Sequence, residues 1–307
     1  MPSASRKVFV SYSHQQGDWV WDRLVPVLKA GGAEVLIDRE RFTAGRALLG
    51  QMEATQDAAE VHVLVFSPDY LASKACLHEM ERAIARDPRF EKGIVVPVKR
   101  AEATLPDAIR DPNPLDVDLT DDSAIASWDR LLDACGADLG TDAPSWLAAR
   151  DETRRFLDRG QSVNLVVDGA VHWRELVADL QRGGLADLVH VNLEKPATAS
   201  RRGLVSEILR AFGMTAPVPA EPEDLAELDR FLSARPRSRL ALSHFDLAAA
   251  RPVYGVDLFA ALRYLVMDSR KLVLLAQSRR PFATLLPAGH PLSEITGIQT
   301  VELRGRR

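Results

Sequence analysis

Cysteine is nearly absent from this sequence. Its 307 residues include two, Cys76 and Cys135, both in segments with helical patterning. Two such residues do not make a disulfide framework, and their scarcity fits a reducing compartment, so we expect a cytoplasmic protein. No group of cysteine and histidine residues has the spacing of zinc ligands. The sequence therefore predicts no metal centre.

Long apolar runs are missing as well. None approaches the roughly 20 apolar residues that a helix needs to cross a bilayer, and residues 1–7 lack the apolar core of a signal peptide. The formal net charge is −4, which gives no general attraction to nucleic acid. We therefore expect neither a membrane nor a nucleic acid as a partner.

What is present is the composition of an ordinary globular protein, with 46% hydrophobic and 27% charged residues. The length is sufficient for two domains with sizeable cores. Residues 136–149 are rich in Gly, Pro, Asp and Thr, which indicates a boundary. We place a first domain at residues 1–140, a linker at 141–150 and a second domain at 151–307.

Short apolar segments alternate with segments of helical periodicity in both predicted domains. Parallel strands need crossover helices, so this alternation predicts an α/β class with two doubly wound parallel sheets. A proline in the fourth strand, Pro97, favours an edge position or a bulge. The expected strands are residues 8–12, 33–37, 61–66, 94–98, 115–119, 164–167, 188–193, 240–242, 272–276 and 300–303. The expected helices are residues 18–28, 46–57, 70–86, 123–135, 202–212, 224–233 and 258–267, with another from residue 173.

One carboxylate is placed differently from the others. The third strand leads into a Ser67-Pro68 turn and then into a helix that carries Glu79 near its first turns. In an open α/β sheet, ligands bind beyond the carboxyl ends of the strands. Most exposed helical glutamates are simply solvated, but this position makes Glu79 a candidate for chemistry on a ligand.

Three separated segments of the first domain resemble the TIR domain family, and the resemblance covers about residues 6–140. Residues 8–13 are similar to the opening strand and its turn, residues 36–46 to the second strand and the long BB loop, and residues 65–79 to the third strand and its helix. The resemblance implies a flavodoxin-like fold for the first domain.

Many TIR domains of this type hydrolyse NAD+ at the nicotinamide glycosidic bond, so the resemblance implies NAD+ as substrate and no cofactor. Glycosidases usually need a second carboxyl group to protonate the leaving group. Nicotinamide in NAD+ is already cationic and departs neutral, so one carboxylate suffices. Glu79 would bind the ribose hydroxyls and stabilise the positive charge that develops in the transition state. It is the expected catalytic residue.

The expected substrate-binding residues lie on the turn after the first strand, on the loop and on the helix of Glu79. An aromatic loop residue, Phe42, would cover the nicotinamide or ribose, and loop arginines would meet the pyrophosphate. Local packing is the alternative for the strand and helix residues, and solubility or contact with another protomer for the arginines. The full set is Ser11, Tyr12, Ser13, Asp38, Arg39, Phe42, Arg46 and Cys76.

The sequence departs from the family pattern at Ala75. Active TIR hydrolases often carry an aromatic residue, commonly Trp, four residues before the glutamate. Residues i and i+4 share a helix face, so Ala75 would leave the stacking wall beside Glu79 thinner. Phe42 or a neighbouring protomer would then supply the stacking. The resemblance also implies self-association, in which the BB loop of one copy completes the pocket of the next.

Residues 150–305 resemble the core of a STAND-type P-loop NTPase in an inactive form, mainly in the order of strands and helices. A P-loop needs Gly-rich turns and a Lys. Residues 165–175 take its place with one glycine, and no Gly-Lys pair occurs anywhere in the chain. The bulky side chains of His172 and Trp173 would obstruct phosphates.

The acidic pair that binds the metal in such enzymes is also missing, because Ser243 and His244 follow the strand where it is expected. We therefore predict neither ATP hydrolysis nor ATP binding. The second domain is interpreted as a sensing, docking or oligomerisation module that meets a protein partner or trigger, with a rigid spacer as the alternative.

Together these features predict an NAD+ glycohydrolase that acts as effector in a bacterial-type immune or antiphage conflict system, activated when TIR domains assemble. A non-catalytic TIR adaptor is the alternative, favoured by Ala75 and disfavoured by Glu79. A cyclase that makes a cyclic ADP-ribose signal is a further alternative, since it shares the first bond cleavage.

Overall fold

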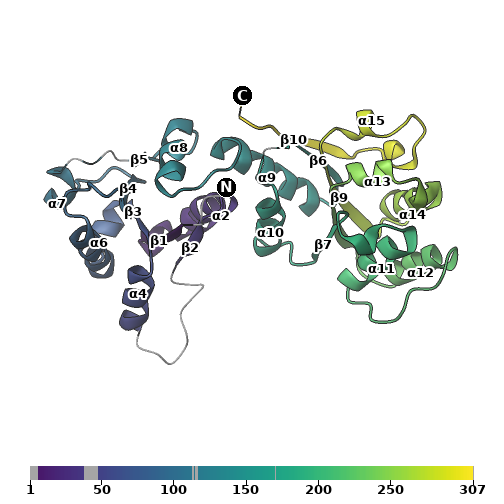
Figure 1. Cartoon of the computed structure of the whole chain (residues 1–307), viewed down its shortest axis with the longest axis horizontal. Helices are drawn as coiled ribbons and strands as arrows, with labels where there is room; N and C mark the ends of the chain where they lie inside the picture. Colours follow the sequence, from purple (N-terminus) through teal and green to yellow (C-terminus); the bar gives the residue numbers. More distant parts are fainter. Residues whose placement is uncertain (1–5, 38–47, 113, 115–116, 170, 307) are drawn as a thin grey trace. The chain divides into compact units, whose positions relative to one another are not determined.

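A computed structural model describes residues 6–37, 48–112, 114, 117–169 and 171–306. The chain divides between Leu147 and Ala148 into two compact units. Each unit is built around one parallel five-stranded sheet with helices packed on it, which confirms the predicted α/β class (Figure 1). We refer to them as the first unit and the second unit.

The first sheet has the strand order β2-β1-β3-β4-β5, with every pair parallel. This is the flavodoxin-like order, in which the chain leaves β1 in one direction and β3 in the other. The elements are β1 Lys7–Tyr12, η1 His14–Gln16, α1 Gly17–Trp19, η2 Val20–Leu24, α2 Val25–Ala30, β2 Glu34–Leu36, α4 Leu48–Asp57, β3 Val61–Phe66, α5 Pro68–Ala72, α6 Lys74–Arg86, β4 Val95–Lys99, α7 Asp107–Arg110, β5 Val117–Asp118 and α8 Ile125–Ala134.

Helices cover both faces of the first sheet. On one face α4 and α6 lie together, joined by a hydrogen bond from Arg82 Nε to Gln56 Oε1 at 3.2 Å. On the other face Trp19 of α1 stacks on Trp128 of α8, with ring centroids 6.1 Å apart. All six residues of β3 are buried between these layers, as its continuous apolar run predicts.

The helix predicted over residues 70–86 is wrong in one respect, because it is two helices, α5 and α6. Ser73 separates them in an extended conformation, with φ −91° and ψ 117°. Its hydroxyl accepts a hydrogen bond from Cys76 N at 3.4 Å and so caps the start of α6. Serine is strongly preferred at such N-caps because it satisfies an otherwise unpaired backbone amide. The break places Glu79 in the second turn of a new helix.

The prediction of an edge position or a bulge for Pro97 is also wrong, because β4 lies between β3 and β5. Arg100 N donates to Phe66 O of β3, and backbone amides alternate in direction along a strand, so Pro97 faces β5. Among the described residues, Val98 and Lys99 of β4 pair with β5.

The second sheet has the order β10-β6-β9-β8-β7, also parallel throughout. Right-handed crossovers put α10 on one face and α11, α12 and α14 on the other, and Figure 1 shows this division. The helix α9 lies beside α10, and Arg150 Nη1 donates to Asp179 Oδ2 at 3.1 Å. The elements are α9 Ala143–Asp158, β6 Val163–Val167, α10 Arg174–Arg182, β7 Leu188–Asn192, η3 Pro196–Thr198, α11 Arg201–Ala211, α12 Glu223–Ser233, β8 Ser238–Ser243, α13 Asp246–Ala250, η4 Pro252–Tyr254, α14 Gly255–Met267, β9 Leu272–Ser278, α15 Phe282–Leu285, η5 Pro291–Glu294 and β10 Gln299–Leu303.

The predicted linker at residues 141–150 is not irregular, because α9 begins at Ala143 and runs through it. Its cap is local: Asp142 Oδ1 accepts a hydrogen bond from Ser145 N at 2.8 Å. An aspartate at this position and a proline in the first turn are both helix-start signals. The division between the units thus falls inside a helix.

Among the described residues, no helix combines the length and apolar character of a membrane span. The same part of the chain holds no group of three or more His, Cys, Asp or Glu side chains arranged to bind a metal ion.

Candidate functional site

Glu79 of α6 lies against the end of β1, at the edge of the first sheet where β1 and β3 terminate. We call this the first carboxyl edge. The glutamate is 9% exposed, and its Oε2 accepts a hydrogen bond from Ser11 Oγ at 2.5 Å. Because the chain leaves β1 and β3 in opposite directions, this edge is the switch point at which open α/β sheets bind ligands. Glu79 is therefore a buried acid and not a solvated one.

Two residues that sequence reasoning missed hold this arrangement. Tyr70 of α5 is fully buried, and its hydroxyl lies 2.9 Å from Ser11 Oγ. Gln56 of α4 is 2% exposed, and its Nε2 donates to the backbone carbonyl of Glu79 at 2.7 Å. Both contacts join residues far apart in sequence, so only the folded topology reveals them.

The structure places the predicted residues of the first strand on different sides of the sheet. Successive strand side chains point to opposite faces, so Ser11 meets Glu79 whereas the hydroxyl of Tyr12 accepts from Trp21 Nε1 at 3.0 Å. Ser13 is buried and caps the short helix η1. Ser11 thus joins Glu79 directly, while Tyr12 is directed toward η2.

Cys76 links the helix of Glu79 to the first strand. It is 6% exposed, and its Sγ lies 3.5 Å from the backbone carbonyl of Tyr12. Its contacts are those of a core residue at the first carboxyl edge. The other four predicted substrate-binding residues, Asp38, Arg39, Phe42 and Arg46, lie outside the described residues.

The outer side of α6 is open to solvent. Ala75, one turn before Glu79, is exposed. His78 is exposed, and its Nε2 lies 3.5 Å from Glu53 Oε1. Ala75 therefore presents only a small, exposed side chain beside Glu79, at the position where the family pattern has an aromatic residue.

The first carboxyl edge combines a buried carboxylate with neutral hydroxyl groups. Burial raises the pKa of Tyr70 well above its usual value, which keeps its phenol protonated. A carboxylate that accepts a hydrogen bond from a hydroxyl group at a sheet switch point is suited to a ligand that carries hydroxyl groups or develops positive charge.

The corresponding edge of the second sheet is occupied by rings. Trp173, immediately before α10, is 8% exposed, and its ring meets His244 edge-on at 5.5 Å and His190 at 6.4 Å between centroids. We call these three residues the Trp173 cluster. Trp173 is the buried member of the cluster, whereas His190 lies within β7 and is exposed, and His244 follows β8.

The Trp173 cluster is tied to the strand ends by hydrogen bonds. His190 Nε2 lies 2.9 Å from Ser243 Oγ, and His244 N donates to Gln277 Oε1 at 2.8 Å. Burial lowers the pKa of His190 and that of His244, so both rings are largely neutral at neutral pH. His244 Nε2 also lies 3.1 Å from Glu194 Oε2, so the cluster is held to β8, β9 and the segment after β7.

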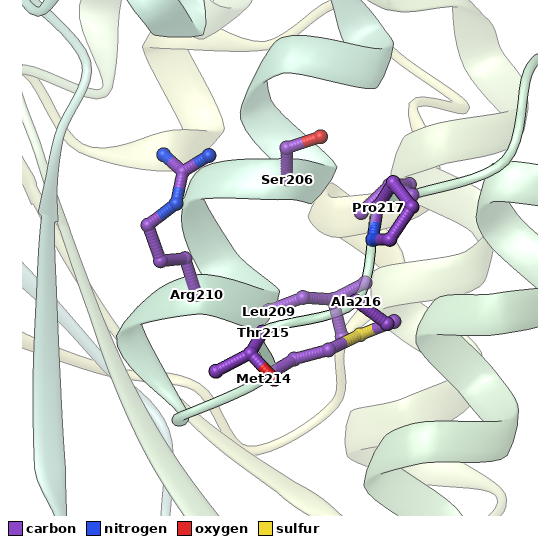
Figure 2. A pocket seen from close by; sticks show the side chains of 8 residues that line it. Ser206, Leu209, Arg210, Met214, Thr215, Ala216 and Pro217 are labelled. Atoms are coloured by element: carbon purple, nitrogen blue, oxygen red, sulfur yellow. The ribbon is translucent and has the colours of Figure 1, made fainter.

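A pocket of about 430 Å³ lies elsewhere in the second unit, between α11 and the loop that follows it (Figure 2). The side chains of Ser206 and Arg210 stand on one side of it, and Met214 and Pro217 lie across from them. The Arg210 guanidinium is already paired with Glu207 of the same helix. The pocket shares no residue with the Trp173 cluster.

Comparison with known proteins gives one family match and several similar solved structures. Residues 8–132 match a family model described as TIR domain. The TIR domain of the Toll-related receptor TRR-2 from Hydra magnipapillata is 17% identical, with a TM-score of 0.38, and the match covers 43% of this chain and 98% of that one.

Other solved structures with similarity include origin recognition complex proteins. The Aeropyrum pernix ORC2 protein is 14% identical over 53% of this chain and 47% of its own, with a TM-score of 0.38. A chain of Drosophila ORC bound to DNA is 17% identical over 52% of this chain and 90% of its own, with a TM-score of 0.39. The chain thus spans less than half the length of the Aeropyrum protein. Among curated proteins, none matches the chain.

Proposed function

Residues 8–132 form a TIR domain, and we propose that this domain cleaves the bond between nicotinamide and ribose in NAD+, with Glu79 as its catalytic carboxylate. The observation that carries the proposal is the burial of Glu79 at the first carboxyl edge, with Ser11 Oγ 2.5 Å from its Oε2. Burying a carboxylate costs free energy unless its environment compensates. The burial of Glu79 therefore favours a functional role over that of a solvated surface residue.

The proposed reaction needs no general acid. When the glycosidic bond breaks, its electron pair stays on the nicotinamide nitrogen, and the cationic ring becomes a neutral leaving group. The ribose carbon takes on oxocarbenium character, and the negative charge of Glu79 stabilises it. Water then bonds to that carbon and loses a proton, which gives ADP-ribose.

We propose that assembly controls this activity. Ala75 is exposed and too small to stack on a ring, so a second copy would supply an aromatic surface beside Glu79. Cleavage would then follow local concentration. Consumption of NAD+ on assembly would make the chain an effector of a bacterial-type defence response.

We propose that the second unit acts as a sensor or docking module without ATP turnover. The Trp173 cluster supports this role, because Trp173 is 8% exposed and packed against two imidazoles at the edge where a phosphate cradle would lie. A protein partner or trigger would act on this unit and bring TIR domains together.

The test compares nicotinamide release by the parent chain and by Glu79→Gln over a range of protein concentrations. Loss of the carboxylate charge is expected to lower kcat by roughly 100-fold or more, the scale of removing a main electrostatic stabiliser. Glu81→Gln is the matched control, since Glu81 is an exposed glutamate of the same helix. Equal release by the parent and Glu79→Gln would refute the proposal.

A non-catalytic adaptor is the second candidate function, and the exposed Ala75 favours it. It predicts no nicotinamide release at any concentration, together with concentration-dependent self-association. The products of the same assay also separate hydrolysis from cyclisation, since a hydrolase gives ADP-ribose and a cyclase gives cyclic ADP-ribose.

A further inference from the structure

We infer that Tyr70 is a positioning residue that acts on Glu79 through Ser11. Three hydroxyl or carboxyl groups from three different elements form one chain at the first carboxyl edge. Ser11 Oγ lies 2.9 Å from the Tyr70 hydroxyl and 2.5 Å from Glu79 Oε2, and all three residues are buried. The catalytic part of the inference rests on the proposed NAD+ cleavage, whereas the positioning itself does not.

The direction of these two hydrogen bonds follows from counting protons. A serine hydroxyl has one proton to donate. The 2.5 Å separation from Glu79 Oε2 is in the range of a hydroxyl bound to a carboxylate. Ser11 therefore donates to Glu79, and its remaining bond, to Tyr70, must be one that it accepts. The hydrogen bonds run from Tyr70 to Ser11 and from Ser11 to Glu79.

Tyr70 is suited to anchor this chain. Its ring lies edge-on to Phe66 with centroids 5.0 Å apart, and its backbone N–H donates to Ser67 Oγ at 3.1 Å. Burial raises the pKa of Tyr70, so its hydroxyl remains a proton donor at physiological pH. A fixed donor at one end gives the small, rotatable hydroxyl of Ser11 a single orientation.

The consequence for Glu79 is orientation of its carboxylate before the substrate binds. Electrostatic stabilisation of a transition state depends on groups that are already aimed where charge develops. An interaction that matters only as charge develops changes kcat and leaves KM unaffected. If the Tyr70 hydroxyl had only a structural role, its loss would leave the properties of Glu79 unchanged. A buried phenol needs a hydrogen-bond partner, but that partner need not be one that acts on Glu79.

The first experiment measures kcat and KM for NAD+ in Tyr70→Phe, Ser11→Ala and the double variant. Tyr70→Phe keeps the ring and is expected to lower kcat roughly five- to ten-fold, the scale of one lost hydrogen bond, with KM unchanged. Because both residues act through one chain, the double variant should lose little more than Ser11→Ala alone. An unchanged kcat in Tyr70→Phe, or losses that multiply, would overturn the inference.

Tyr254→Phe is the matched control. Tyr254 is another fully buried tyrosine whose hydroxyl donates to a backbone carbonyl, that of Thr198, at 2.5 Å in the second unit. Removing that hydroxyl tests the general cost of such a change. The control should keep the parent kcat.

A second measurement does not depend on activity. The carboxyl ¹³C resonance of Glu79, assigned by its disappearance in Glu79→Gln, reports the hydrogen bonds that its oxygens accept. Tyr70→Phe and Ser11→Ala should both move this resonance, and Tyr254→Phe should leave it in place. If the parent chain releases no nicotinamide, the proposed function fails, while a shifted resonance still supports positioning. A resonance unmoved in Tyr70→Phe overturns positioning even in an active enzyme.

Discussion

The two units present the same edge of the same kind of sheet in opposite states. At the first carboxyl edge a buried glutamate is held by hydroxyl groups, with Ser11 Oγ 2.5 Å from Glu79 Oε2. At the second, the buried Trp173 ring meets two imidazoles edge-on, those of His190 and His244. Parallel sheets place strand ends together whatever the sequence is. The side chains that follow the strands then decide whether the edge serves chemistry or packing.

The difference is also one of charge. The first edge offers a carboxylate, which favours a cationic or hydroxylated ligand. The second offers imidazoles whose pKa values are lowered by burial and then by neighbouring cations such as Lys195 and Arg174, and the chain has no Gly-Lys pair of the kind that a P-loop needs. Substitutions at each edge should therefore affect different measurements, catalysis at the first and stability at the second.

Emptying the second edge should have the largest effect on stability. Trp173→Ala removes a large ring that is 8% exposed, and its cavity should lower the free energy of unfolding by about 3 kcal/mol or more. Urea denaturation measures the change. Tyr264→Ala, which alters a 47% exposed aromatic residue of the same unit, should change it by less than about 0.5 kcal/mol. Equal losses would show that the second edge is not filled by tight packing.

Lowering the pH should destabilise the first unit through His62, a residue outside its carboxyl edge. Burial, and then the charge of Arg86, lower the pKa of His62 from 6.5 to about 4. The unfolded chain therefore binds this proton first, and stability falls as the pH drops from 6.5 toward 4. Linkage gives a loss of up to about 2 kcal/mol at pH 5 relative to pH 7.5.

Denaturation at the two pH values in the parent and in His62→Gln measures this term, which the variant should lack. His78→Gln, a change at the exposed histidine of α6, is the control and should retain it. The same acid sensitivity in the parent and in His62→Gln would contradict the assignment.

A larger side chain at position 75 should raise the rate of nicotinamide release at the first carboxyl edge. Ala75→Trp adds a ring beside Glu79, and stacking worth about 1 kcal/mol corresponds to a roughly five-fold higher rate of nicotinamide release. Ala72→Trp, at an exposed alanine of α5, should leave the rate unchanged. A rate unaffected by Ala75→Trp would indicate that the nicotinamide ring does not lie over this face of α6.

ATP should not bind at the second edge, so it should not change the thermal stability of the protein. Mg-ATP added to the parent chain should leave its Tm unchanged, because a ligand stabilises only a state that binds it. The complementary measurement at the first edge is the Tm of Glu79→Gln with added NAD+. A Tm that rises with ATP concentration would contradict the interpretation of Trp173 as a plug.

Much of the fold could be predicted because strand signals are local. The apolar run of residues 61–66 coincides with β3. The start of α9 has local signals too, in Asp142 and Pro144, but these residues are equally typical of a linker. The same two residue types mark loops and helix starts, and only the apolar periodicity that follows them distinguishes the two.

The candidate site could be predicted only in part. Glu79 follows from its place after a strand, whereas its contacts with Ser11 and Gln56 depend on how separate elements meet in the fold. Strand alternation alone would have separated Ser11 from Tyr12, since neighbouring side chains take opposite faces. Tyr70 lies within residues 65–79, but nothing in one sequence shows that its hydroxyl reaches Ser11.

The break at Ser73 makes this segment sensitive to length. Because the cap fixes where α6 begins, it also fixes the direction in which Glu79 points around the helix axis. One residue inserted between Ser73 and Glu79 would turn the glutamate by about 100° and bring His78 toward Ser11. We therefore expect this stretch to accept substitutions at its exposed positions, whereas a single insertion or deletion would disconnect the acid from the sheet without unfolding the helix.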